Sequence, residues 1–355
     1  MPFTNAPNYE CIPLRSEEVT IAVLQSRIRN IDTSTPQSAH DGKMKNIEHM
    51  ANLIAQAQAW GRKDLICFHE SPIGGFSLRW NKDQFMAAGV DFPEGEELEA
   101  IGKITQRYNC YLEFGCYAKL KDWPGHFVNM ATIVGPTGKV IYGRWKTRNL
   151  SSFADLGATI YDVLDEFVKR YGWDQIFPVC RTDIGNIAII PEVSEPEMAR
   201  VYAMKGAEIL VRYMTLGAGH WNTSPLLGPR GGSDNTFVID MQGMCINSGV
   251  YGAFVNNALD REDDVILDIG TGHSCILDPE GRILIEASSP FETWADATIP
   301  LAAYRKRHWI PRFPKELYAH AYDNYTPRFP TNSYLKKQPQ TIKEIGQHYS
   351  AIARW

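Results

Sequence analysis

The stretch that most constrains the fold runs from Asn186 to Arg200. Apolar, strand-forming residues fill positions 187–190, the run stops at Pro191-Glu192, and a helix pattern begins near Pro196. A turn from strand to helix is where α/β enzymes often present their nucleophile, because its side chains project from the sheet edge into a cleft. The tip of this turn carries neither a thiol nor a hydroxyl. Catalysis at this place would therefore need other groups.

Strand and helix patterns alternate along most of the chain, with two hairpins inserted. The apolar runs predict strands at 19–25, 64–68, 111–118, 208–213 and 251–256, and hairpins at 129–142 and 274–286. Apolar residues at helical spacing predict helices at 43–60, 96–108, 197–205 and 234–246, and a loop followed by a helix within 151–171. The stretch 214–232, rich in Gly, Pro and Ser, is expected to form a long loop over a cleft. This order indicates an α/β protein.

Composition and charge narrow the range of partners. The 355 residues, 44% of them hydrophobic, suffice for one large domain or two ordinary ones. A net charge of -5 gives no reason to expect nucleic acid. The chain has no long apolar run and no signal-like N-terminus, which predicts a cytoplasmic protein without a membrane span. It also lacks an H-E-x-x-H motif, a phosphate-binding glycine loop and a zinc spacing, so we expect a small-molecule substrate, no metal and no cofactor.

Six pieces of sequence together carry a resemblance to a known family. They lie at 21–25, 68–70, 129–146, 182–185, 196–210 and 272–274 with the hairpin that follows. No single piece is specific, but in this order they resemble the nitrilase (carbon-nitrogen hydrolase) superfamily, in the style of its aliphatic amidase and formamidase branch. The resemblance covers about residues 19–300. It implies a four-layer α-β-β-α sandwich, with two sheets face to face inside helical layers, in a nitrilase-like domain at 1–303.

The resemblance also implies a set of site residues. In the family a Glu acts as general base, a Lys stabilises the oxyanion, and a Cys attacks the amide or nitrile carbon. The Glu falls on Glu70 and the Lys on Lys146. A further family Glu, which helps to position substrate, falls on Glu166 or is replaced by Asp155.

The position of the family cysteine depends on the end of the turn from which it is counted. Counting back six residues from Pro196 reaches Ile190, with Glu192 as the family's acidic residue. Counting forward seven residues from Gly185 reaches Glu192 itself, because the turn is two residues shorter than the family pattern. Neither position is a cysteine, and neither an isoleucine nor a carboxylate can support the thioester route.

The cysteines elsewhere in the chain offer no obvious replacement. There are seven, without a C-x-x-C pair, and most lie in apolar runs, which predicts buried free thiols. Cys180 precedes the turn at the far end of its strand, roughly 15 Å or more from the tip. Cys67 lies three positions before Glu70 and is expected to face the core.

The remaining polar residues predict proton-transfer chemistry. Glu70, Lys146 and Glu192 are expected to converge on one cleft, where each shifts the pKa values of the others. They would act on a small amide-, nitrile- or carboxylate-like substrate in a hydratase, lyase or isomerase, or in hydrolysis without a thioester. The alternative is a catalytically silent paralogue that binds a small ligand or a partner protein, with these groups left as an ion-pair network. The residues expected to bind substrate are Glu166, Ile190, Pro191, Tyr213 and His220.

Three further titratable residues have two interpretations each. His69 and His220 are either acid-base or metal-binding groups, or structural histidines. Glu113 lies inside an apolar strand, where a structural role beside a basic group is the more usual one and a catalytic role the alternative.

The composition shifts at the end of the chain. Residues 304–355 combine a basic start with several prolines and many aromatic residues. This favours an arm that wraps a neighbouring subunit, with a segment that binds nucleic acid as the rival interpretation. Members of the resembled family commonly pair through the helices that follow the turn. We therefore expect a homodimer or a larger homo-oligomer, reinforced by the arm.

Overall fold

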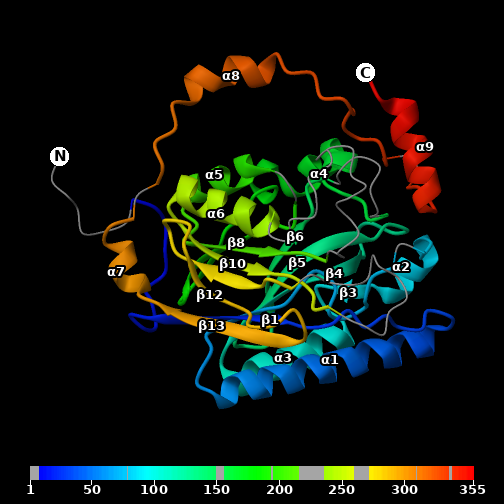
Figure 1. The fold of residues 1–355 in the computed structure, drawn as a ribbon. Coiled ribbons are helices and arrows are strands. Elements are labelled where there is room, and N and C mark those ends of the chain that lie inside the picture. Colours follow the sequence, from blue (N-terminus) through cyan, green and yellow to red (C-terminus); the bar gives the residue numbers. More distant parts are fainter. Residues whose placement is uncertain are drawn as a thin grey trace.

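Two β-sheets pack face to face between layers of helices in the computed structural model of the chain (Figure 1). The structure describes residues 8–77, 79–148, 156–192, 195–215, 236–259, 272–308, 310–335 and 338–355. Side chains of both sheets share one buried apolar cluster, and each outer face is covered by helices. The predicted four-layer sandwich is confirmed. No helix of the described ranges is long and apolar enough to cross a membrane.

The first sheet has the strand order β13-β1-β2-β4-β5-β6, with β3 paired to β4. Its strands are β1 (Val19–Gln25), β2 (Leu65–Cys67), β3 (Val90–Phe92), β4 (Tyr111–Leu120), β5 (Val128–Val134), β6 (Val140–Trp145) and β13 (Thr293–Ile299). Strands β1, β2 and β4 are parallel, whereas β5 and β6 form the predicted antiparallel hairpin. The segments after β2 and β6 therefore emerge at the same end of this sheet.

The second sheet has the order β12-β11-β10-β9-β8-β7. Its strands are β7 (Cys180–Thr182), β8 (Gly185–Ile189), β9 (Ile209–Tyr213), β10 (Tyr251–Val255), β11 (Cys275–Leu277) and β12 (Ile283–Glu286). Strands β8, β9 and β10 are parallel and wholly buried. This explains why their sequences are continuous apolar runs without a polar face.

Two pairs of helices form the outer layers. Helices α1 (Pro36–Ala59) and α3 (Glu96–Tyr108) pack on the first sheet, and α5 (Pro196–Met204) and α6 (Thr236–Ser248) pack on the second. Helix α1 starts at a capping box, in which the Thr35 side chain accepts from the backbone N–H of Ser38 while the Ser38 hydroxyl accepts from the N–H of Thr35. The helices predicted in these regions are confirmed.

A loop followed by a helix is predicted within 151–171, and the structure describes residues 156–171 of this stretch. The helical part starts with a turn at Tyr161–Val163 and continues as α4 (Leu164–Tyr171). The N–H groups of Ala158 and Ile160 instead donate to the carbonyl oxygens of Phe127 and Lys146. The described part of the stretch is therefore a non-helical segment followed by a helix, because backbone groups that bond to the sheet edge cannot also form helical hydrogen bonds.

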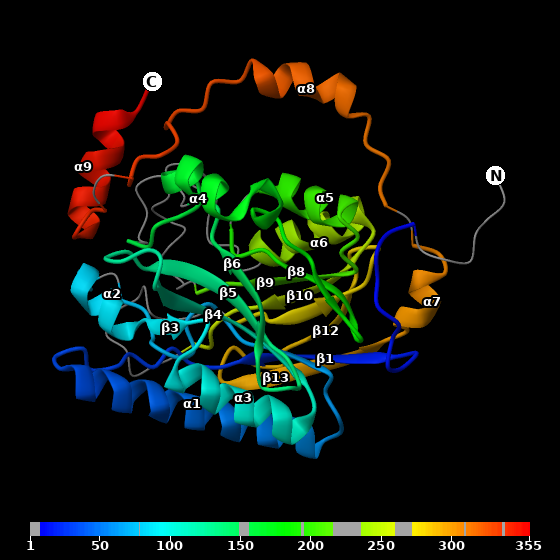
Figure 2. The ribbon, with the colours of Figure 1, turned by 180° about the vertical axis from the view of Figure 1, so that it is seen from behind.

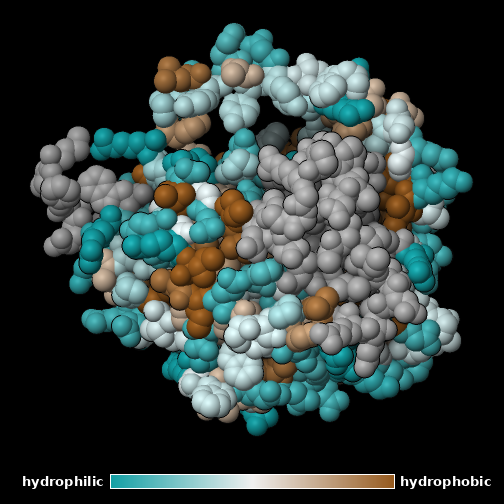
Figure 3. All heavy atoms as spheres, viewed as in Figure 1, coloured by the Kyte–Doolittle hydropathy of each residue, from teal (hydrophilic) through white to brown (hydrophobic). Residues whose placement is uncertain are grey.

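The C-terminal stretch 304–355 leaves the sandwich and returns to it. Helix α7 (Leu301–Arg305) is anchored by its last residue, since Arg305 binds both carboxylate oxygens of the buried Glu208. Helix α8 (Lys315–Asp323) has no buried residue and arches clear of the body, with an opening beneath it (Figures 2 and 3). Helix α9 (Ile342–Ile352) packs against the body again, beside the short helix α2 (Lys82–Ala88).

Candidate active site

Glu70 and Lys146 meet at one end of the first sheet. Glu70 follows β2 and Lys146 follows β6, and Lys146 Nζ lies 3.4 Å from Glu70 Oε1. The Asn129 amide donates to the same carboxylate oxygen over 2.5 Å. The two charged side chains are each 14% exposed, so they are mostly but not completely shielded from solvent. The structure thus brings together the predicted base and the predicted oxyanion-stabilising lysine.

The strand registers explain this convergence. The backbone N–H of Lys146 donates to the carbonyl oxygen of Asn129, so these two residues are neighbours on adjacent strands. Glu70 approaches them by crossing β4 at Gly115. A Cβ at Gly115 would lie 2.5 Å from the Glu70 carbonyl oxygen, so only glycine lets the two backbones come this close.

Tyr213 connects the second sheet to this group. Its hydroxyl donates to Asn129 Oδ1 over 3.2 Å, and the Asn129 amide in turn binds Glu70. Burial, and then the negative charge of Glu70, raise the pKa of Tyr213, which keeps the hydroxyl protonated and donating. The predicted substrate-binding Tyr213 therefore lies close to the pair. Asn129 is not among the residues predicted for the site, although a polar residue at the start of an apolar hairpin strand is a signal that could have identified it.

Glu192 lies next to this group but has partners of its own. Arg144 binds its two carboxylate oxygens over 2.9 Å each, and both side chains are fully buried. The hydroxyl of Thr147 donates to Glu192 over 2.7 Å, and the Thr147 N–H donates to the same oxygen. Burial alone would raise the pKa of Glu192, but Arg144 and Thr147 outweigh it and lower the pKa. Glu192 is thus a buried anion that holds Thr147 beside Lys146.

Ile190 faces away from the Glu70–Lys146 pair. Ile189 belongs to the cluster between the sheets, whereas Ile190 packs with Met198 and Met241 in the helical layer. Successive side chains of a strand point to opposite faces, so the residue after Ile189 must face the helices. Pro191 follows and is buried. The structure brings neither Ile190 nor Pro191 into contact with Glu70 or Lys146 by any described interaction.

Three of the predicted residues lie elsewhere or cannot be placed. Glu166 is on the surface of α4, where it pairs with Lys169 and Arg170 one turn away, so it does not approach Lys146. Asp155 and His220 lie outside the described residues. Sequence could not decide between Glu166 and Asp155 because the loop before α4 has no regular spacing.

The cysteines are poorly suited to act as nucleophiles. All seven are free, and six of them are buried. Burial raises the pKa of Cys116, Cys180 and Cys275 to about 12, which disfavours the reactive thiolate. Cys11 is the partly exposed cysteine. The carbonyl oxygens of its neighbours accept from Asn186 and Arg305, so Cys11 lies at the opposite end of β8 from Glu192.

His69 and Glu113 are structural neighbours of the site. His69 is fully buried, its Nδ1 accepts from the Ser71 N–H, and burial lowers its pKa to about 3, so it is neutral. Glu113 was expected to pair with a basic group, and this is wrong for the described part of the chain. Among the described residues, no basic side chain binds either carboxylate oxygen of Glu113. The carboxylate lies beside the thiol of Cys67 instead. Burial raises the pKa of Glu113 well above its usual range.

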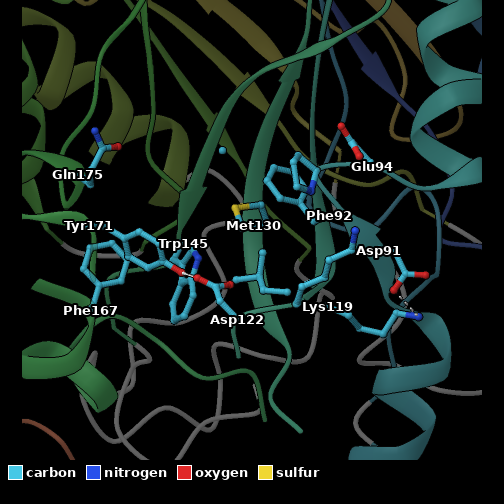
Figure 4. A pocket seen from close by; sticks show the side chains of 14 residues that line it. Asp91, Phe92, Glu94, Lys119, Asp122, Met130, Trp145, Phe167, Tyr171 and Gln175 are labelled. Carbon is cyan, nitrogen blue, oxygen red and sulfur yellow. Dashed lines mark hydrogen bonds and ion pairs between the residues drawn. The ribbon is translucent and has the colours of Figure 1, made fainter. Parts of the chain in front are cut away.

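A cavity of about 700 Å³ lies on the reverse face of the strands that carry the site (Figure 4). Trp145, Phe167 and Tyr171 form one side, and Met130 lies between them and Phe92. Because side chains alternate along a strand, Trp145 lies behind Lys146 and Met130 behind Asn129. The cavity is therefore separate from the Glu70–Lys146 pair.

Known proteins resemble this chain over most of its length. The sequence model of the family described as Carbon-nitrogen hydrolase matches residues 20–308. The protein named Omega-amidase NIT2 of Bos taurus is 24% identical over 285 residues, which cover 77% of this chain and 90% of that protein. The protein of the same name from Danio rerio is 24% identical over 262 residues, which cover 70% of this chain and 82% of that protein.

Solved structures share the fold. Saccharomyces cerevisiae Nit3, a member of branch 10 of the nitrilase superfamily, has a TM-score of 0.60 at 16% identity, covering 90% of this chain and 100% of its own. An amidase from Nesterenkonia sp. has a TM-score of 0.57 at 16% identity, covering 87% of this chain and 98% of its own. With the family match spanning most of the sequence, the chain belongs to the carbon-nitrogen hydrolase (nitrilase) family.

Proposed function

We propose that the protein is an enzyme of the nitrilase fold that acts on a small amide-, nitrile- or carboxylate-like molecule without a thioester. The observation that carries the proposal is the contact between Lys146 and Glu70, supported by the Asn129 amide on the same carboxylate oxygen. A lysine beside a partly buried carboxylate can stabilise a developing oxyanion while the carboxylate transfers a proton. The names of the omega-amidase relatives point to terminal amides as the first substrates to test.

In hydrolysis of an amide, Glu70 would accept a proton from a water molecule. The water oxygen would then bond to the amide carbon, and Lys146 would stabilise the negative charge on the former carbonyl oxygen. As the carbon–nitrogen bond breaks, the proton held by Glu70 would pass to the leaving nitrogen. The products are a carboxylic acid and ammonia or an amine. With a nitrile, addition of water by the same two groups would give an amide.

The acid-base assignment to Glu70 rather than Glu192 follows from their partners. Glu192 is bound by Arg144 through both oxygens and by Thr147, and its pKa is lowered, so it is a weak base. We propose that Glu192 positions the Lys146-Thr147 segment. No cysteine is available between β8 and α5 for a covalent intermediate.

The test is a panel of short amides and nitriles, including dicarboxylic acid monoamides, with release of ammonia or formation of the amide as readouts. We expect turnover by the wild-type chain and a loss of about 100-fold or more in both Glu70→Gln and Lys146→Met. Ser350→Ala, at an exposed position on α9, is the matched control. Turnover that survives both substitutions would refute the proposal, and an acyl adduct on a cysteine in mass spectrometry would replace it with thiol chemistry.

The second candidate function is a catalytically silent paralogue that binds a small ligand or a partner protein. The observation that favours it is the fully paired Arg144–Glu192 ion pair beside a turn that is stiffened by Pro191. In this case calorimetry would detect binding of a compound from the same panel, while no product would form. The substitutions of Glu70 and Lys146 would then change only the dissociation constant.

We also propose that the protein forms a homodimer or larger homo-oligomer. Exposed apolar side chains gather over α6 and the edge strand β12, namely Ile239, Ile246, Ile283, Leu284 and Ile285, where Figure 3 shows a hydrophobic patch. An apolar edge strand left open to water favours pairing with another chain. The exposed part of the C-terminal arm, α8, would add to this contact. A monomeric mass in light scattering would refute the assembly.

The free thiols further favour a reducing, cytoplasmic compartment.

A further inference from the structure

We infer that the C-terminal segments 329–335 and 338–349 support the backbone of the active site, and that Ser333 and Tyr349 position Lys146 by holding Asp162. The inference rests on the proposed function for its catalytic consequence. The structural coupling itself can be measured without any activity. The coupling consists of three links between Lys146 and the C-terminal segment, and each link is made by contacts between described residues.

The first step connects Lys146 to the segment before α4. The carbonyl oxygen of Lys146 accepts from the N–H of Ile160 over 3.1 Å, and that of Thr147 accepts from the N–H of Tyr161 over 2.8 Å. Among the described strands, β6 is the edge of its sheet, so no further strand pairs with it on this side. Residues 160 and 161 therefore fix the backbone from which the Lys146 side chain extends.

The second step connects this segment to the C-terminal segment. The Asp162 carboxylate accepts from the Ser333 hydroxyl over 2.8 Å and from the Tyr349 hydroxyl over 3.2 Å. The N–H groups of Asn332 and Tyr334 donate to the carbonyl oxygens of Tyr161 and Asp162, each over 2.9 Å. The two segments thus pair through backbone and side chains at the same place.

The third step is the burial that holds the C-terminal segment in position. Tyr334 is fully buried in the core cluster that also contains Trp145, and Tyr349 packs in the cluster that contains Phe127. Asp162, between them, is 1% exposed. By contrast, no residue of α8 in the preceding arch is buried. The segment after the arch is therefore anchored as part of the domain core, not as a loose tail.

A positioning role for this segment makes a specific prediction for catalysis. If Lys146 stabilises charge mainly in the transition state, a small displacement lowers kcat and leaves KM nearly unchanged. Loss of the Ser333 and Tyr349 hydroxyls removes two hydrogen bonds from Asp162 without removing the buried rings or altering Glu70. The substitutions that do this are Ser333→Ala and Tyr349→Phe.

The experiment is hydrogen exchange on the full chain carrying both substitutions. We expect the amides of Ile160 and Tyr161 to exchange about tenfold faster or more, while amides of β1 and β13 exchange as in the wild type. The matched control carries Ser350→Ala and Tyr322→Phe, at exposed positions on α9 and α8, and should match the wild type. Unchanged exchange at Ile160 and Tyr161, or an equal increase throughout the chain, would overturn the inference.

The kinetic arm uses the same variants with any substrate that the wild type turns over. A fall in kcat of about tenfold or more with KM unchanged supports positioning, whereas unchanged kcat with faster exchange overturns its catalytic part. If the wild type turns over none of the panel, the proposed function fails, and the exchange result still decides whether the segment holds Lys146.

Discussion

Arg144 binds both carboxylate oxygens of Glu192, and both side chains are almost completely buried. The pair joins the edge strand of the first sheet to the segment that follows β8 in the second. It is also the reason why Glu192, a candidate for the nucleophile position, is held as an anion with fixed partners. Two consequences follow from this: the fold depends on the pair, and Glu70 is left as the accessible carboxylate beside Lys146.

Replacing Glu192 by Gln is expected to destabilise the fold by about 3–5 kcal/mol, because it leaves the buried Arg144 without its anion. Urea unfolding at neutral pH measures this. The folded pKa of Glu192 is lowered, so its contribution is present above the pKa of the unfolded carboxyl and is lost as the pH falls towards the folded value. The variant should therefore lose less stability than the wild type on acidification. Equal stability of the two proteins at pH 7 would contradict this account.

Glu113 should act on stability in the opposite direction. Burial raises its folded pKa, so folding favours the protonated form, and stability falls as the pH rises above the pKa of the unfolded carboxyl, about 4.3. Glu113→Gln keeps the shape and removes this titration. We expect the variant to gain stability relative to the wild type between pH 5 and pH 8, as measured by denaturant unfolding. Glu166→Gln, on the surface, is the control. If both variants showed the wild-type pH dependence, the predicted cost of burying Glu113 would be wrong.

Gly115→Ala tests the close approach of Glu70 to β4. The added methyl would lie 2.5 Å from the Glu70 carbonyl oxygen and 2.9 Å from the ring of Tyr213. Overpacking of this kind costs about 1–3 kcal/mol and would displace Glu70 from Lys146. We expect Gly115→Ala to have a lower melting temperature than the wild type. We also expect it to lose turnover at temperatures where it is still folded, so that the loss of stability does not account for the loss of activity. Gly243→Ala, on α6 with open space around its Cβ, should leave turnover unchanged and should not lower the melting temperature, because alanine favours a helix more than glycine does.

Limited proteolysis should cut the arch and leave its far end bound. Helix α8 is exposed and carries Lys315, a trypsin site, whereas Tyr334, Ile345 and Tyr349 are buried in the body. We expect an early cleavage near Lys315 after which the fragment that contains α9 remains attached in size-exclusion chromatography. Separation of that fragment under native conditions would show that the C-terminal segment is not anchored as the contacts indicate.

Local patterns were sufficient to predict most of the elements. The apolar runs that became β1, β8 and β9, and the amphipathic stretch that became α1, have the spacing that burial on two faces or one face requires. Within 151–171 the sequence did not indicate where the loop ends and the helix begins, because the N–H groups of Ala158 and Ile160 bond to distant carbonyl oxygens of the sheet. Sequence spacing contains no information about such long-range partners.

The family, the layered fold and the lack of a cysteine in the turn between β8 and α5 could all be read from the amino-acid sequence. The sequence also predicted Glu70 and Lys146 as site residues, which lie 76 positions apart and are within 3.4 Å in space. The packing of the two sheets was needed to learn that Ile190 faces the helices, that Glu192 is bound by Arg144, and that Asn129 donates to Glu70. The physical reason is that a strand's periodicity fixes which residues share a face, whereas the packing of two sheets decides which of those faces meet.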